Sequence, residues 1–139
     1  MRQASTELEF STSRQGLMEI TREVIDWTMA QGFEQGLLTL FCRHTSASLL
    51  IQENAAREVR TDLERYFARL APEDPDAYAH DDEGPDDMPA HLRTALTAVQ
   101  LSIPLIAGQL ALGTWQGIYL FEHRCRPHRR SVAVHLFGE

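Results

Sequence analysis

The chain has 139 residues, a length that suits one domain able to bury its own core. Its net charge of -7 argues against a general nucleic-acid binder, and no apolar stretch is long enough to span a membrane. All 13 cationic side chains are arginine, which excludes a Schiff-base lysine and a phosphate-binding loop of the Walker type.

The N-terminal half shows alternating strand and helix patterns after a start that lacks the layout of a signal peptide, so we expect a cytoplasmic protein. Residues 5–13 alternate weakly between polar and apolar side chains, as an edge strand does. The apolar spacing within residues 17–31 is helical. Residues 37–44 predict a mostly buried strand, and residues 53–70 predict an amphipathic helix.

The C-terminal half begins with a long acidic loop and ends in strands. Residues 71–87 are rich in Asp and Pro, and Asp87 is placed to cap a following helix that has Pro89 in its first turn. Three strands are then predicted, at residues 101–107, 114–122 and 130–137. Helices and strands mix without a regular β-α-β alternation. We therefore predict one α+β domain over residues 1–139, with a mixed or antiparallel sheet and about three helices.

The first segment with functional potential follows the strand at 37–44. It reads His44, Thr45, Ser46, Ala47, Ser48. If a helix follows this segment, its hydroxyls and the unpaired N–H groups of the helix could hold a phosphate. The alternative is that the hydroxyls only shape the turn.

The second segment is the acidic loop with its two histidines. Eight acidic residues and no arginine lie between Glu73 and Asp87, and His80 and His91 flank the densest part of this run. Such a set suits a divalent metal: zinc would take the histidines, and magnesium would take more carboxylates. A solvated acidic loop without a metal is the alternative.

The third segment is the strand predicted at 114–122 and the basic run after it. Gln116 and Glu122 share one face of the strand because side chains alternate. Glu122 is a candidate base or carboxylate ligand. Arg124, the first of four arginines up to Arg130, is a candidate clamp for a phosphate.

Together these segments resemble the YjbQ family. The resemblance rests on residues 44–55 (HTSASLLIQENA), 80–92 (HDDEGPDDMPAHL), 102–124, which include the specific block LGTWQGI, and 129–139 (RRSVAVHLFGE). It implies a compact α+β protein that assembles as a homotrimer with sites near subunit boundaries. It also implies secondary thiamine-phosphate synthase activity, which joins hydroxymethylpyrimidine diphosphate to thiazole phosphate and releases pyrophosphate.

The resemblance and the residue chemistry together give candidate roles for ten residues. The substrate is expected to be a small phosphorylated metabolite, and the cofactor a divalent metal, zinc or magnesium. The predicted catalytic residues are His44, His91 and Glu122; the predicted phosphate- or substrate-binding residues are Thr45, Ser46, Ser48, Asn54, Gln116 and Arg124; the predicted metal ligands are His44, His80 and His91.

The same residues are compatible with two other functions. The same residues could activate water in a metal-dependent hydrolase of a small metabolite. The chain could also be a non-catalytic trimeric module that binds a metal or an anion. The thiamine reaction itself could be a side activity.

Overall fold

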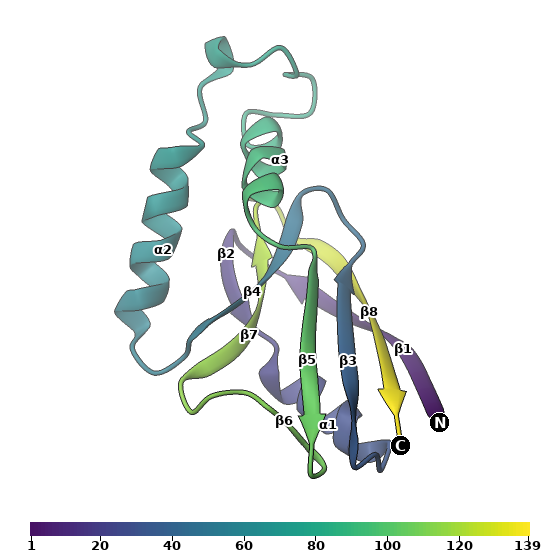
Figure 1. Cartoon of the computed structure of the whole chain (residues 1–139). Coiled ribbons are helices and arrows are strands. Elements are labelled where there is room, and N and C mark those ends of the chain that lie inside the picture. Colours follow the sequence, from purple (N-terminus) through teal and green to yellow (C-terminus); the bar gives the residue numbers. More distant parts are fainter.

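The computed structural model describes residues 1–139 as two antiparallel sheets and three α-helices, which confirms the α+β prediction (Figure 1). The strands are β1 (Arg2–Thr12), β2 (Gly16–Glu19), β3 (Gln35–Cys42), β4 (Ala47–Glu53), β5 (Gln100–Ile106), β6 (Gln109–Leu110), β7 (Gln116–Glu122) and β8 (His128–Gly138). The helices are α1 (Thr21–Ala30), α2 (Arg57–Leu70) and α3 (Asp87–Leu96), with a 3-10 turn at Pro75–Ala77. The five-stranded sheet has the order β1-β8-β3-β5-β6, and the three-stranded sheet has the order β2-β7-β4.

The main hydrophobic core fills the space between the two sheets. Ile118 and Leu120 of β7 belong to this core of 16 buried residues, together with inward-facing residues of β3, β5 and β8. Tyr119 and Phe121, on the opposite face of β7, form a second cluster with Leu17, against which Phe67 of α2 packs. β7 is therefore buried on both faces, which explains why burial is continuous along it instead of alternating.

The outer face of the five-stranded sheet exposes large apolar side chains. Leu37 and Phe41 of β3, Ile106 of β5 and Phe137 of β8 are each between 44% and 61% exposed. They share this face because Leu37 lies opposite Phe137 and Pro104 in the strand register. Several large exposed apolar side chains on one sheet face are typical of a protein interface.

Two of the helix predictions in the N-terminal half are wrong in their boundaries. Residues 16–19 form β2, which pairs with β7, and α1 begins only at Thr21. The helix predicted at 53–70 begins at Arg57, and the preceding residues 47–53 form β4 instead. In both places a short strand pairs with the buried β7, a long-range contact that local apolar spacing does not reveal.

The remaining elements lie at the predicted segments, with two corrections: β3 is buried on one face only, not mostly buried, and the cap of α3 differs. β1 is an edge strand, and β5, β7 and β8 occupy the three segments predicted for the C-terminal strands. The cap residue of α3 is Asp86, without a side-chain cap bond, so the prediction that Asp87 caps this helix is wrong. None of the helices is long and apolar enough to cross a membrane; the longest has 14 residues.

A buried histidine lies where β7 ends. His123 is fully buried, and its Nε2 lies 2.9 Å from the hydroxyl of Ser48 on β4. Burial lowers the pKa of His123 to about 3, and the positive charge of nearby Arg93 acts in the same direction. The folded protein therefore keeps this ring neutral at pH values where an exposed histidine is protonated.

We predict that acid destabilises the protein through His123. Its folded pKa of about 3 lies below the unfolded value, so its contribution to stability is present above pH 6.5 and is lost progressively as the pH falls toward 3. Between pH 7 and 5 this loss is about 2 kcal/mol in the free energy of unfolding. Urea unfolding of wild type and His123→Gln at both pH values measures it, with the exposed His135→Gln as control. Equal pH dependence in all three proteins would show that the folded state protonates His123.

Candidate functional site

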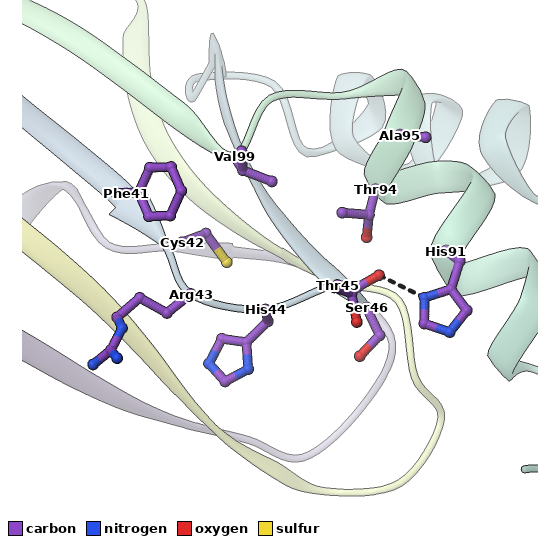
Figure 2. Close-up of a pocket in the computed structure, with 10 residues that line it drawn as sticks. All are labelled: Phe41, Cys42, Arg43, His44, Thr45, Ser46, His91, Thr94, Ala95 and Val99. Carbon is purple, nitrogen blue, oxygen red and sulfur yellow. Dashed lines mark hydrogen bonds between the residues drawn. The ribbon is translucent and has the colours of Figure 1, made fainter.

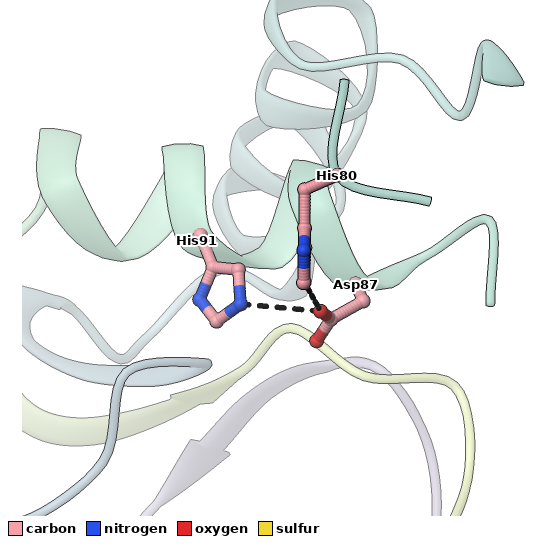
Figure 3. Close-up of side chains that lie close together, drawn as sticks. All are labelled: His80, Asp87 and His91. Carbon is pink, nitrogen blue, oxygen red and sulfur yellow. Dashed lines mark hydrogen bonds and ion pairs between the residues drawn. The ribbon is translucent and has the colours of Figure 1, made fainter. Parts of the chain in front are cut away.

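Two histidines and one aspartate meet at the start of α3. Asp87 and His91 lie one helical turn apart, and His80 comes from the loop that precedes the helix (Figure 3). The Nε2 atoms of His80 and His91 lie 2.8 Å and 3.2 Å from Oδ2 of Asp87. One ligand atom from each residue falls within 4.8 Å of the others, which is the arrangement of a three-ligand metal site.

Asp87 is the charged centre of this cluster. Its burial opposes ionisation, but the hydrogen bond from His80 and the charges of His91 and Arg124 outweigh burial and lower the pKa of the carboxyl group. The carboxylate in turn raises the pKa of His80 through their hydrogen bond. Asp87 is therefore ionised near neutral pH and available as a ligand.

His91 is oriented by a backbone group. Its Nδ1 lies 2.8 Å from the carbonyl oxygen of Thr45, in the turn between β3 and β4, so this nitrogen must carry a proton and donate. In a neutral ring, Nε2 then has a lone pair that faces the Asp87 carboxylate. Two acceptors at this distance repel each other unless a second proton or a metal cation lies between them.

An open cavity adjoins the cluster on the His91 side (Figure 2). Its volume is about 750 Å³. One part of its wall is apolar and another carries hydroxyl and imidazole groups. The lining residues are Phe41, Cys42, Arg43, His44, Thr45, Ser46, His91, Thr94, Ala95 and Val99.

His44 lines this cavity but lies outside the cluster. Its Nε2 accepts a hydrogen bond of 2.8 Å from the backbone N–H of Ser131, so the ring proton is on Nδ1. Burial, and then the charge of Arg130, lower the pKa of His44. We predicted His44 as a third metal ligand; the structure instead brings Asp87 to His80 and His91.

Glu122 is buried in an ion pair with Arg130. Arg130 Nε lies 2.7 Å from Oε2 of Glu122, and the Thr12 hydroxyl donates to the same oxygen at 2.7 Å. Burial opposes ionisation of Glu122, but these hydrogen bonds lower its pKa. Because Glu122 comes from β7 and its partners from β1 and β8, the pair joins the two sheets. Its carboxylate is enclosed and is not presented to the cavity.

Two predicted anion-binding residues, and the turn between β3 and β4, are placed differently from our expectation. Arg124 binds Asp86 and Asp87 instead of facing an open site. Ser48 is fully buried against His123 and Thr97. The turn at 43–46 leads into a strand, so it has no helix N-terminus with which to hold a phosphate. Thr45 and Ser46 do line the cavity.

Two other predicted residues lie at the opposite end of β7. Gln116 pairs with Glu53, whereas Glu122 pairs with Ala47 in the same register. Glu122 lies six positions after Gln116 along the strand, so the two residues are roughly 20 Å apart. Asn54, next to Glu53, donates to Glu19. The structure therefore does not bring Asn54 and Gln116 to the cluster.

Sequence reasoning missed the site roles of Asp87 and Arg130. Asp87 was included in the acidic run that suits a divalent metal but was not named as a ligand, although its spacing of four residues from His91 places both side chains on one helical face. That spacing was a usable signal. No local pattern indicates that Arg130 is the partner of Glu122, because the pair depends on how two sheets pack.

The chain is similar to known proteins along nearly its whole length. A family model described as UPF0047 protein YjbQ-like matches residues 6–139. A UPF0047 protein of Synechocystis is 50% identical over 138 residues, which cover 99% of this chain and 94% of that protein. The UPF0047 protein YjbQ of Salmonella typhimurium is 43% identical, with coverage of 95% and 96%.

Solved structures share the fold. A YjbQ/UPF0047 family protein of Clostridium acetobutylicum superposes with a TM-score of 0.86 at 32% identity, covering 95% of this chain and 99% of that one. A conserved hypothetical protein of Thermus thermophilus gives a TM-score of 0.80 at 36% identity, with the same coverage. The names of these relatives describe a family and state no reaction.

We predict that neutralising Glu122 destabilises the fold strongly. Glu122→Gln leaves the buried Arg130 guanidinium without its counter-charge, a change that costs about 3–5 kcal/mol. Urea unfolding measures the free energy, and Glu9→Gln is the control because it breaks an exposed pair with Arg129 worth less than about 1 kcal/mol. Equal losses in the two variants would contradict a sheet-joining role for Glu122.

Proposed function

The chain belongs to the YjbQ/UPF0047 family, and we propose that it is a divalent-metal-dependent enzyme acting on a small phosphorylated metabolite. The proposed ligands are His80, Asp87 and His91. The observation that carries this proposal is the contact of 3.2 Å between Nε2 of His91 and Oδ2 of Asp87. With Nδ1 of His91 donating to Thr45, either a second proton or a cation between Nε2 and Oδ2 makes this contact attractive, and we propose that a cation takes that place.

The donor set favours zinc over magnesium. Two imidazoles and one carboxylate are typical ligands of catalytic zinc, whereas magnesium prefers oxygen. Ligand atoms around a tetrahedral zinc lie roughly 3.4 Å apart at usual bond lengths. The distances of 2.8 Å and 3.2 Å to Oδ2 are close to this value, so small movements of the side chains would admit the ion.

The cavity supplies the groups that would bind a substrate. His91 borders both the cavity and the cluster, so a ligand in the cavity would reach the metal. His44 has Nδ1–H free to donate, since its Nε2 is occupied by Ser131. Thr45 and Ser46 add hydroxyl groups. A bound divalent ion would supply charge to stabilise a leaving phosphate or diphosphate, or would lower the pKa of a bound water.

Thiamine-phosphate synthesis is the transferase reaction that we propose to test first, because the family resemblance implies it. Its diphosphate leaving group would need positive charge. Arg124 and Arg130 are engaged within the chain, and Arg43 at the cavity wall is paired with Glu7, so that charge would come mainly from the metal. His44 would donate to a phosphate oxygen.

A metal-dependent hydrolase is the second candidate, and the ligand set favours it. Two histidines and one carboxylate, with further positions open to water, are typical of zinc hydrolases. His44 would then stabilise charge that develops on the substrate. Both candidates use the same residues and differ in whether the acceptor is a second metabolite or water.

We also propose that the protein is a trimer, as the resemblance implies. The exposed apolar side chains on the outer face of the five-stranded sheet support an interface there. Phe41 belongs both to this face and to the cavity wall, so a neighbouring subunit packed on the face would border the substrate site. Sedimentation analysis would give the mass.

We predict tight binding of one zinc ion per chain. Calorimetric titration is expected to give a stoichiometry of one, and zinc at 100 times its Kd should stabilise the fold by about 2.7 kcal/mol. His91→Ala and Asp87→Asn should lose binding because each removes a ligand, whereas His44→Ala should keep it. Equal loss in His44→Ala, or no binding by wild type, would contradict this ligand set.

We predict metal-dependent turnover that separates the candidate functions. Pyrophosphate released only when hydroxymethylpyrimidine diphosphate and thiazole phosphate are both present indicates the transferase; phosphate released from a single metabolite indicates the hydrolase. Removal of the metal should abolish either reaction, and His44→Ala should lower kcat on the order of 100-fold. If the protein binds the metal but turns over none of these compounds, the result would contradict an enzymatic role and would favour a non-catalytic binding module.

A further inference from the structure

We propose that Arg124 is a positioning residue for the metal site, which it serves by holding one oxygen of Asp87 so that the other is left for the ion. The proposal rests on the metal site proposed above and goes beyond it, because Arg124 is not a ligand. It also replaces our prediction that Arg124 clamps a phosphate of the substrate.

The guanidinium group of Arg124 makes three hydrogen bonds to the segment that carries Asp87. Its Nη1 donates to Oδ1 of Asp87 at 2.7 Å, and its Nε donates to Oδ2 of Asp86 at 2.9 Å. Its Nη2 donates to the carbonyl oxygen of Glu83 at 2.8 Å. All three nitrogens donate within the chain, so the directions of the guanidinium group are fixed by Asp86, Asp87 and Glu83.

The two oxygens of Asp87 have separate tasks as a result. Oδ1 faces Arg124, whereas Oδ2 faces both histidines. A carboxylate held in this way binds an ion through one oxygen and leaves further positions of the ion open to substrate or water. Without Arg124, the carboxylate could rotate and bind through both oxygens, which would fill one of those positions.

Arg124 is itself anchored to the buried core. Its backbone N–H donates to Oε1 of Glu122 at 3.0 Å, and the backbone N–H of Cys125 donates to Asp86 at 2.9 Å. Glu122 is held by Arg130 and Thr12, which belong to the five-stranded sheet. A continuous series of contacts therefore runs from the junction of the two sheets to the metal ligand.

The shape of the guanidinium group is part of the proposed role. Arg124 bridges two neighbouring carboxylates and a carbonyl with donors in a fixed fork. A lysine ammonium is a point charge on a flexible chain and cannot reproduce this set of directions. Charge alone would therefore restore the site only in part.

Zinc affinity and a cobalt spectrum test the proposal. Zinc Kd values of wild type, Arg124→Gln and Arg124→Lys are measured by competition with a chromophoric chelator. Loss of a residue that orients a ligand typically weakens metal binding 10–100-fold, and we expect this for Arg124→Gln, with partial recovery in Arg124→Lys. The visible spectrum of bound Co²⁺ should also change, because it reports the number and geometry of the ligands. Arg126→Gln, an exposed arginine two residues away, is the matched control.

The outcomes distinguish failure of the proposed metal site from failure of the positioning role of Arg124. If wild type binds no metal, the metal site itself fails. If wild type binds zinc and Arg124→Gln has the same Kd and the same cobalt spectrum, the positioning role is overturned. If Arg124→Gln does not fold, the zinc affinities of Arg124→Lys and Asp86→Asn test the positioning role instead. Asp86→Asn removes the second carboxylate that holds the guanidinium group and leaves Asp87 intact. Unchanged zinc affinity in both would likewise overturn the proposal.

Discussion

The ion pair between Glu122 and Arg130 is the contact on which the site depends. It lies between the sheets, where an unpaired charge would be strongly destabilising. From it, Arg130 reaches the carbonyl and hydroxyl oxygens of Ser46 at 3.1 Å each, which fixes the turn that lines the cavity. Glu122 fixes the backbone of Arg124, whose side chain contacts Asp87 of the cluster. One buried pair thus sets both the cavity wall and the cluster.

Much of the fold could be predicted from the sequence, and the errors share one cause. Elements whose own apolar residues repeat with a clear helical or strand spacing, such as α2 and β8, were predicted near their true positions. β2 and β4 were missed because they are short strands that exist through pairing with β7. β7 is apolar on both faces, and only the presence of α2 on one side and the main core on the other explains that pattern.

The sequence indicated which segments form the candidate site more reliably than it indicated the role of each residue. His80 and His91 lie together, and His44, Thr45 and Ser46 line the adjoining cavity. The chemistry expected of Glu122 and Arg124 assumed that their charges were free. In the structure each charge is neutralised by a partner on another element, and residue type alone does not distinguish a charge that supports a site from one that contacts a substrate.

The pairing of β1 with β8 has a consequence for the way the chain can be rearranged. Arg2 lies opposite Gly138, so the two termini adjoin at the end of the sheet away from α3 (Figure 1). A short linker could join them, and new termini could be opened in the exposed loop before His80. Such a circular permutant would carry His80 near a free chain end while Asp87 and His91 stay on their helix. The length of the chain that connects His80 to the rest of the cluster could then be varied without changing Asp87 or His91.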